Sequence, residues 1–446
     1  MIKTLLIPHK IVTVNSKDEI LTNHAVEIED RFIRSIINLK DIDLENYDGV
    51  VVRYPNYTLI PGFVQTHIHL CQTLFRGLAD DLELLDWLQQ RIFPYENAHS
   101  KESLRISAKL GINELQTGGT TTILDMGTIR HHEQVMEELI SSGMRAISGK
   151  CMVDENDLMP QFKESIKDSI NSSVELANEF HNSAEGRVKY GFAPRFVLSC
   201  SEKLLKETVE LTNQFEGSVY HTHSSENKNE VAEVRRKFSK ENIDYFNSIG
   251  VLGNNTVLAH CIHTNENEIN LLKHTGTKIS HCPSSNLKLG SGIANIPEYI
   301  KRGISVSLGA DGAPCNNNLS AFTEMRLAAL IQKPLYGPTA MDAKTVFKLA
   351  TIEGAKALHL EEEIGSVEAG KKADLVLIDL ETPTNSLDPA DDLTYSNIVY
   401  TASKENVKAV MIDGEWVVKN GESLVYDPNE LVSEGRTELH NLIDRV

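Results

Sequence analysis

The chain has 446 residues, and its 44 Lys and Arg against 63 Asp and Glu give a formal net charge of −19 at pH 7. Such an acidic surface repels phosphate backbones, which excludes nucleic acid as a partner of the folded surface but not a small nucleoside as a ligand. The length suffices for a barrel enzyme with a small second domain.

The cysteines and the apolar runs indicate a cytoplasmic protein. None of the six cysteines forms a C-x-x-C pair, and a disulfide framework is not expected in so long a chain. The first residues, MIKTLLIPHKIVTVN, lack the uninterrupted apolar core and the cleavage site of a signal peptide. No apolar run reaches the roughly 18 residues that a membrane-spanning helix needs, so we expect no membrane partner.

Both ends of the chain are predicted to form short strands. In residues 1–60, the segments LLIPHKIVTV, HAVEIEDRFIRSII and GVVVRYPNYTLI alternate apolar and polar residues. Residues 363–446 begin in the same way with ADLVLIDL and VKAVMIDGEWVVKNGE, and the piece DGEWVVKNG is typical of a hairpin. We therefore expect the two ends to form one small β-sandwich domain, with a tail after it.

The middle of the chain, residues 61–362, alternates strand-like runs with amphipathic helical stretches. The predicted strands are LIPGFVQTHIH, TTTILDM, RAISGKCM, RVKYGFAP, SVYHTHSS, NTVLAHC, TKISHCP and ISVSLGADG. Eight strand–helix repeats in one domain predict the α/β class and a (β/α)8 TIM barrel. In that fold the chemistry lies at the C-terminal ends of the strands, so the polar residues that close each apolar run are the candidate site.

Two of the predicted strands close with a pair of histidines. His67 and His69 end the first strand and, being two residues apart, point to the same side. His221 and His223 end the fifth strand in the same manner, and Glu226 follows on the loop. Two imidazoles on one face at a strand end form half of a zinc-type site.

The sixth, seventh and eighth strands also close with potential metal ligands. These are His260, His281 and Asp311, in that order. Chance placement at the same end of successive strands does not explain the whole series. Neutral imidazoles and a carboxylate suit Zn²⁺ or Fe²⁺, with one coordination position left for water.

The motifs PGFVQTHIH, HTHSSE, LAH, HCPSSNLKLGSG and GADGAPCNN resemble the amidohydrolase superfamily. More narrowly, they are similar to its cytosine deaminase-like branch, which includes adenosine-type nucleoside deaminases, guanine deaminase and triazine hydrolases. The segment IGSVEAGKKADLVLIDL also resembles that branch. The resemblance runs from about residue 3 to residue 420, with the motifs in the expected order.

This resemblance implies one divalent metal ion, Zn²⁺ in the first place, with Fe²⁺ and Mn²⁺ as alternatives. The implied ligands are His67, His69, His223 and Asp311. Glu226 and His260 would handle protons together with Asp311, and His281 would touch the substrate. His221 would either contact the site directly or pack behind it. Because the branch is mononuclear, Lys150 is not expected to be a carbamylated, metal-bridging lysine.

The segment LFRGLADDLELLDWLQQRIFPYE resembles the substrate-covering helix of adenosine-type deaminases. By that resemblance Glu96 would bind ribose hydroxyls, and Trp87 and Phe93 would stack on a purine. In contrast, Arg195 in a PRF segment and Gln72 fall where guanine deaminase binds its base. The histidine that adenosine-type members have after the fourth strand is missing from YGFAPRFVLSCS.

We therefore predict a metal-dependent deaminase of a 5′-modified adenosine, such as 5′-deoxyadenosine, methylthioadenosine or S-adenosylhomocysteine, which releases ammonia. A guanine or oxopurine deaminase and an s-triazine hydrolase are the alternatives, because all three would use the same attack on a ring carbon. A non-catalytic barrel would be expected to have lost a ligand or Glu226, and none is missing. The expected partner is a small heterocycle, and homo-oligomerisation is left open.

Overall fold

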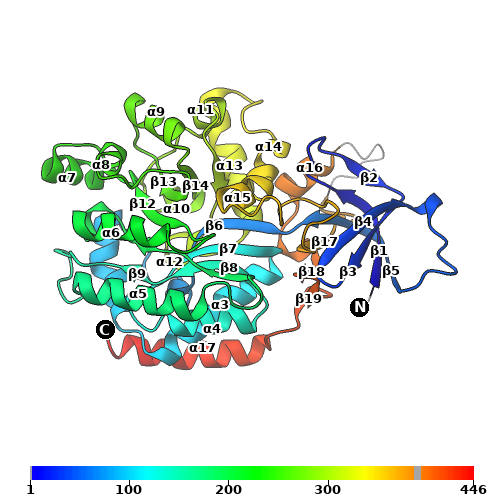
Figure 1. Ribbon diagram of the computed structural model, residues 1–446, viewed down its shortest axis with the longest axis horizontal. Coiled ribbons are helices and arrows are strands. Elements are labelled where there is room, and N and C mark those ends of the chain that lie inside the picture. Colours follow the sequence, from blue (N-terminus) through cyan, green and yellow to red (C-terminus); the bar gives the residue numbers. More distant parts are fainter. Residues whose placement is uncertain (1–2, 386–392) are drawn as a thin grey trace.

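The computed structural model describes residues 3–385 and 393–446 and contains the predicted TIM barrel (Figure 1). Each of the eight predicted segments contains one barrel strand. The barrel strands are β6 (Phe63–His69), β7 (Thr120–Met126), β8 (Arg145–Gly149), β10 (Val188–Tyr190), β12 (Tyr220–Ser224), β13 (Thr256–His260), β14 (Lys278–His281) and β15 (Val306–Leu308). The α/β class and the barrel predicted from the sequence are thereby confirmed.

The barrel strands form two parallel arcs that meet at both ends. One arc has the order β10-β8-β7-β6 and the other the order β12-β13-β14-β15. A parallel bridge between Phe192 and Tyr220 joins the arcs on one side. On the other side, the short strand β16 (Asp311–Gly312) follows β15 and pairs with β6, which places Asp311 opposite Ile68. This pairing brings the end of the eighth repeat beside the first H-x-H pair.

Helices surround the barrel in Figure 1. They are α3 (Lys101–Thr117), α4 (Glu133–Ser141), α5 (Ile166–Phe180), α6 (Glu202–Thr212), α7 (Lys228–Phe238), α8 (Asn242–Ser248), α9 (Glu266–Thr275), α10 (Pro283–Lys288), α11 (Ile296–Lys301), α12 (Ala313–Asn316), α13 (Ala321–Tyr336), α14 (Ala343–Leu349) and α15 (Ile352–Ala357). Side-chain caps start several of them: Ser100, Ser165 and Ser201 each accept a hydrogen bond from a backbone N–H of the first turn. Among the described residues, no helix is both long and apolar enough to cross a membrane.

Strands from both chain ends combine in one nine-stranded sheet, where the sequence predicts a β-sandwich built from both ends. They are β1 (Lys3–Val12), β2 (Ile20–Thr22), β3 (His24–Glu29), β4 (Phe32–Asn38), β5 (Val50–Pro61), β17 (Leu375–Asp379), β18 (Val407–Ile412), β19 (Glu415–Lys419) and β20 (Glu422–Ser423). The two halves join where β5 pairs with β17. The predicted hairpin connects β18 and β19 through Asp413 and Gly414, both with positive φ, as a two-residue turn of this type requires. Domain boundaries at 60/61 and 362/363 stay a prediction.

A buried ion pair connects the sheet to the barrel. Arg145, at the start of β8, donates to Asp374 from Nε at 2.7 Å and from Nη2 at 2.9 Å, and both side chains are at most 3% exposed. Removing one partner would leave an uncompensated buried charge, which costs about 3–5 kcal/mol.

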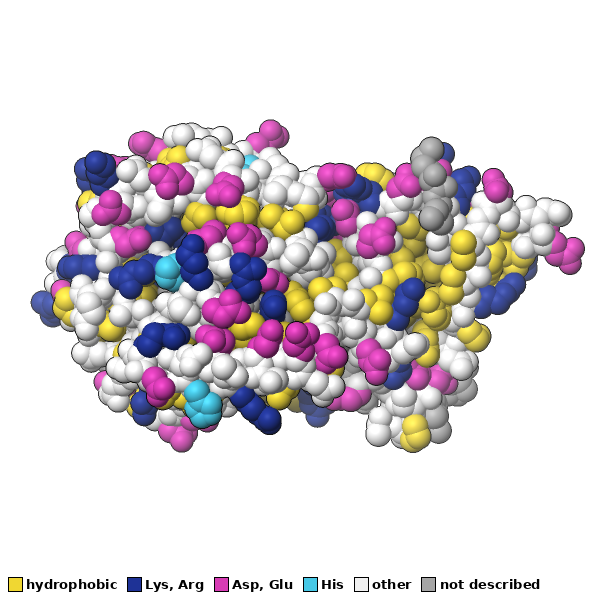
Figure 2. Space-filling view, turned by 90° about the horizontal axis from the view of Figure 1, so that it is seen from below, with side chains coloured by type: hydrophobic (Ala, Val, Ile, Leu, Met, Phe, Trp, Pro, Cys, Tyr) yellow, Lys and Arg dark blue, Asp and Glu magenta, His cyan; other side chains and the backbone are white. Residues whose placement is uncertain are grey.

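On the face seen in Figure 2, acidic and basic side chains are interspersed over the barrel, and hydrophobic side chains gather over the smaller domain.

Two helical segments lie outside the strand–helix repeat of the barrel. Residues 84–97, here called the covering helix, run through α1 (Leu84–Trp87), a π-helical stretch (Leu88–Ile92) and α2 (Phe93–Asn97). The last helix, α17 (Pro428–Ile443), packs along α3 of the barrel instead of joining the terminal sheet. The remaining short elements are β9 (Cys151–Met152), β11 (Ala193–Pro194), α16 (Thr394–Ser396), the 3-10 turns Leu39–Asp41, Leu70–Phe75, Val197–Ser199 and Lys404–Asn406, and the π-turn Asn397–Thr401.

Candidate metal centre and active site

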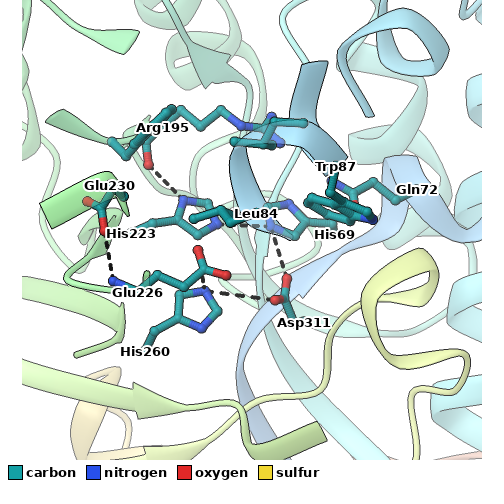
Figure 3. Close-up of a pocket in the computed structure, with 12 residues that line it drawn as sticks. His69, Gln72, Leu84, Trp87, Arg195, His223, Glu226, Glu230, His260 and Asp311 are labelled. Carbon is teal, nitrogen blue, oxygen red and sulfur yellow. Dashed lines mark hydrogen bonds and ion pairs between the residues drawn. The ribbon is translucent and has the colours of Figure 1, made fainter. Parts of the chain in front are cut away.

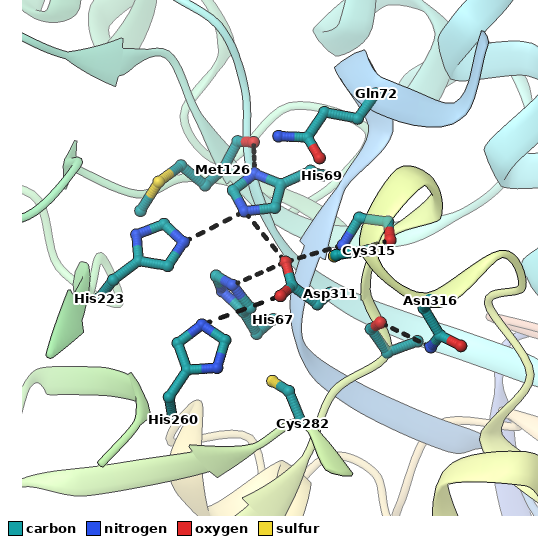
Figure 4. A network of polar contacts seen from close by, with 12 residues as sticks. His67, His69, Gln72, Met126, His223, His260, Cys282, Asp311, Cys315 and Asn316 are labelled. Carbon is teal, nitrogen blue, oxygen red and sulfur yellow. Dashed lines mark hydrogen bonds and ion pairs between the residues drawn. The ribbon is translucent and has the colours of Figure 1, made fainter. Parts of the chain in front are cut away.

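Four side chains converge at the C-terminal ends of the barrel strands: His67, His69, His223 and Asp311 (Figure 4). All four are buried, and their potential ligand atoms lie within 4.8 Å of one another. The Nε2 atoms of His67 and His69 are each 3.3 Å from Oδ1 of Asp311. His69 Nε2 lies 3.3 Å from His223 Nε2. These are the four residues predicted as metal ligands.

Contacts behind the imidazoles point their Nε2 atoms toward the common centre. His69 Nδ1 lies 2.8 Å from the carbonyl oxygen of Met126, and His223 Nδ1 lies 2.7 Å from that of Arg195. A carbonyl only accepts, so each Nδ1 carries the proton and each Nε2 lone pair is free to coordinate. The backbone of the neighbouring strands therefore sets the tautomers.

These residues fit a divalent metal ion. His67 Nε2 is buried and has no hydrogen-bond partner among the described residues, so a ligand in the centre would satisfy it. Burial lowers the pKa of His67 and of His223, and it lowers that of His69 to about 3. Neutral imidazoles are the form that binds metal. Three of them and one carboxylate match the donors that Zn²⁺ and similar ions prefer.

A proton-handling pair lies beside the cluster. Glu226 Oε2 is 3.5 Å from His260 Nε2, which is in turn 3.8 Å from Asp311 Oδ2 (Figure 3). Burial, followed by the charge of Asp311, raises the pKa of Glu226 well above its ordinary value, so this carboxyl is able to hold a proton. The Asn286 side-chain oxygen lies 2.8 Å from His260 Nδ1 and fixes the ring. Glu226 and His260 are therefore close enough to each other and to Asp311 for acid–base chemistry in this pocket.

A pocket opens next to these groups. Its lining includes members of the four-residue cluster, the Glu226–His260 pair and an apolar wall. The lining residues are His69, Gln72, Leu84, Trp87, Leu88, Arg195, Phe196, His223, Glu226, Glu230, His260 and Asp311. The wall of Leu84, Trp87 and Leu88 comes from the covering helix, as Figure 3 shows for the two of them that it labels, Leu84 and Trp87.

The amidohydrolase family model matches residues 58–417 of this chain. The chain belongs to the amidohydrolase family. It is 39% identical over 403 residues, 90% of each chain, to a protein of Methanobrevibacter smithii named 5'-deoxyadenosine deaminase. It is 37% identical to the 5-methylthioadenosine/S-adenosylhomocysteine deaminase of Thermoanaerobacter pseudethanolicus, over 86% of this chain and 87% of that one. A zinc-containing adenosine deaminase structure from Xanthomonas campestris superposes with a TM-score of 0.92 at 28% identity, covering 99% of both chains.

In this amidohydrolase, Gln72, Glu96 and Arg195 form one buried network. Gln72 Nε2 donates to Glu96 Oε1 at 2.8 Å, and Arg195 Nη1 lies 3.0 Å from Glu96 Oε2. Glu96 does not line the pocket, whereas Gln72 and Arg195 do. The buried Gln72 Oε1 has no hydrogen-bond partner among the described residues. Gln72 and Arg195 therefore connect the pocket lining to the carboxylate of Glu96 behind it.

The remaining predicted substrate residues occupy different positions. Trp87 lines the pocket, and its indole nitrogen is buried without a hydrogen-bond partner in the described chain. Phe93 stacks on Phe162 at a centroid distance of 5.2 Å and lies under the Arg195 guanidinium, 5.1 Å from it, so it supports Arg195 and does not line the pocket. His281 is buried and lies outside the pocket lining. Neither of its ring nitrogens has a hydrogen-bond partner among the described residues.

Several residues that support the amidohydrolase site were not predicted. Asp125 Oδ1 accepts from the backbone N–H of Leu70, the residue after the H-x-H pair, at 2.8 Å. Glu230 Oε2 accepts from the backbone N–H of Glu226 at 2.9 Å. The E-x-x-x-E spacing in SSENKNE was a visible signal for Glu230, whereas the contact of Asp125 depends on strand pairing. Lys150 pairs with Glu164 and Ser172, away from the metal cluster.

His221 packs behind a ligand and is not one of the four clustered residues. Its Nε2 lies 2.8 Å from Nδ1 of His67, which needs an acceptor there to keep its own Nε2 free for a metal.

Replacing His221 by Phe is expected to weaken metal binding by roughly 10- to 100-fold, the usual effect of losing a partner behind a metal ligand. Competition against a chromogenic chelator measures this, and His221→Gln, which keeps an acceptor, should lose less. Equal metal affinities for the unmodified protein, His221→Phe and His221→Gln would contradict the role of His221 in orienting His67.

Proposed function

We propose that this amidohydrolase hydrolyses the exocyclic amino group of a 5′-modified adenosine, such as 5′-deoxyadenosine, methylthioadenosine or S-adenosylhomocysteine, and releases ammonia. The observation that carries this proposal is the buried Glu226–His260 pair beside the four clustered side chains, on the wall of a pocket. The names of the two curated relatives, both deaminases of 5′-modified adenosines, support the choice of substrate.

We propose Zn²⁺ as the ion that His67, His69, His223 and Asp311 hold, because nitrogen donors with one carboxylate are typical zinc ligands. The Xanthomonas adenosine deaminase contains zinc and supports this choice. A divalent ion at such a site would lower the pKa of a water molecule to about 7, which would supply a nucleophile at neutral pH.

The chain's own groups handle the protons. Glu226 holds a proton that it donates to the ring nitrogen next to the amino group, which makes the adjacent carbon electrophilic. His260, fixed by Asn286, faces the same space through Nε2 and stabilises the charge that develops on the attacking oxygen. Asp311 accepts one proton of the attacking water and returns it to the departing amino group as ammonia forms. The second proton of that water passes to Glu226 as the carbonyl group forms, which restores the acid, and the ring nitrogen keeps the proton that Glu226 gave.

Gln72 and Arg195 are placed to bind the sugar or the base. In the nucleoside proposal, ribose hydroxyls contact the side chains of Gln72 and Arg195, while Glu96 holds both side chains in position. The same two polar side chains would fit a ring carbonyl next to an N–H group. This network therefore supports an oxopurine base, such as guanine, as the second candidate substrate.

Ammonia release from 5′-deoxyadenosine, methylthioadenosine and guanine, with chloride release from a chlorotriazine, separates the candidates. We expect kcat/KM for a 5′-modified adenosine to exceed that for guanine by about 100-fold, because a site built for hydroxyl groups is left with unpaired polar atoms by a ligand that lacks them. Ammonia from guanine but from none of the adenosines would replace the nucleoside with the oxopurine base.

Gln72→Leu tests the recognition network within the same assay. The substitution removes the unpartnered buried acceptor, and we expect KM for the nucleoside to rise about 10-fold or more. Gln89→Leu is the matched control, since Gln89 lies on the covering helix, outside the pocket lining, and is exposed. A Gln72→Leu enzyme with wild-type KM for the nucleoside would show that this acceptor does not contact the substrate.

A further inference from the structure

The last described helix, α17, ends against the segment that carries Glu96. Arg445, two residues beyond the end of α17, donates from Nε to the carbonyl oxygen of Ala98 at 2.7 Å and from Nη2 to Ser103 Oγ at 3.2 Å. Ala98 is the residue that ends α2, and Ser103 belongs to the capping box of α3. One guanidinium therefore connects the end of the covering helix to the start of α3.

The contact with Ala98 meets a general need of helix ends. The last carbonyl groups of a helix lack partners within it, and a cation is favoured there by the helix dipole. Arg445 supplies both a donor and a positive charge at this point. Ala98 lies two residues after Glu96, so the contact lies half a turn from the carboxylate that orders Gln72 and Arg195.

Packing holds the end of α17 firmly in place. Gly435 allows close contact with α3, since a Cβ there would lie 3.3 Å from Leu110. Further along, Leu442 is fully buried and belongs to the same hydrophobic cluster as Trp87 and Phe93 of the covering helix. Arg445 is thus presented by a helix that is packed on the barrel over its length.

We propose that the end of α17, through Leu442 and Arg445, acts as a latch that positions the covering helix and, with it, the Glu96–Gln72–Arg195 network. Arg445 is a positioning residue, since it acts on the substrate only through that network. The consequence for nucleoside binding rests on the proposed function, whereas the latch itself rests on the contacts of α17.

The position of the catalytic groups predicts which kinetic constant changes. The metal ligands and the proton-handling pair lie on the strands of the barrel and the loop after β12, and none of them lies on the covering helix. Loosening the latch should therefore weaken substrate binding and leave the chemical step intact. A general loss of folded structure would instead lower kcat and metal content as well.

Arg445→Ala in the full-length, metal-loaded protein tests the latch. We expect KM for 5′-deoxyadenosine to rise about three- to tenfold with kcat within about twofold, in line with the loss of a charged contact at a helix end. Hydrogen exchange of the amides in residues 88–98 should become faster by a similar factor, with metal content unchanged. Arg436→Ala, at an exposed position on the same helix, is the control, and Arg445→Lys should recover part of the effect.

Two results would overturn the proposal. Unchanged exchange in residues 88–98 would show that Arg445 does not hold the covering helix. Faster exchange with an unchanged KM would show that the latch does not reach the binding network. If the unmodified protein deaminates no aminopurine nucleoside, the proposed function fails, but the exchange measurement still decides whether the latch exists, because it needs no substrate.

Discussion

Glu226→Gln is expected to lower kcat by roughly 10²- to 10⁴-fold, the usual contribution of a positioned acid or base. Gln has nearly the same size, but its amide cannot give up a proton to a ring nitrogen. Glu226 lies outside the group of four clustered ligands, so metal content should stay at the level of the unmodified protein. Single-turnover measurements of ammonia release, together with elemental analysis of the same samples, give both quantities.

A neighbouring carboxyl provides the matched control. Glu230→Gln makes the same chemical change four residues away, and burial raises the pKa of Glu230 to about 7. Its carboxylate holds the backbone N–H of Glu226, so we expect its loss to have a much smaller effect on kcat. A Glu226→Gln enzyme with more than a tenth of the normal kcat would remove Glu226 from the proton transfer.

Stripping the protein of divalent cations is expected to lower activity by about 10³-fold or more. Loss of a metal removes several kcal/mol of transition-state stabilisation, and each 1.36 kcal/mol corresponds to a factor of ten. Addition of Zn²⁺, Fe²⁺ or Mn²⁺ to the stripped protein should restore turnover, and the ion that restores it at the lowest concentration identifies the preferred metal. Asp311→Ala, which removes the only carboxylate of the four ligands, should not recover under the same conditions.

Metal binding should also stabilise the fold. An ion that binds only the folded state adds about 2.7 kcal/mol when its free concentration is 100 times Kd. The melting temperature of the stripped protein should therefore rise on titration with the restoring ion, and much less so for Asp311→Ala. Full activity in stripped protein without any detectable cation would contradict the metal-dependent mechanism.

The barrel strands and the polar residues at their ends were predictable because each apolar run, and the residue at which it stops, can be read from neighbouring positions in the sequence. Each barrel strand is a short apolar run, and parallel strands align their C-terminal ends by the geometry of the fold. Polar residues at these ends, among them His67, His69, His223 and Asp311, were therefore expected to lie near one another once the strands were recognised. The family resemblance added their roles, which residue spacing alone left open.

The recognition network depends on the folded structure. Glu96 was predicted to contact ribose directly, yet it is ion-paired with Arg195, 99 residues away, and hydrogen-bonded to Gln72, 24 residues away. His221 similarly contacts His67 across 154 residues. No local pattern encodes such contacts, because each partner is brought close only when the barrel closes.

The sequence by itself determined the eight strands of the barrel and the joining of the two chain ends, because short-range periodicity fixes where apolar strands stop and polar side chains begin. The family resemblance, and not periodicity, singled out His67, His69, His223 and Asp311 among the polar residues at the strand ends. Only the tertiary structure decided what lies behind those side chains. It showed that His221 orients His67 and that Glu96 stands behind Gln72 and Arg195, and it placed Arg445 against Ala98 across 347 residues. His221 and Glu96 are buried away from water, so they depend on partners that the closed fold brings near them.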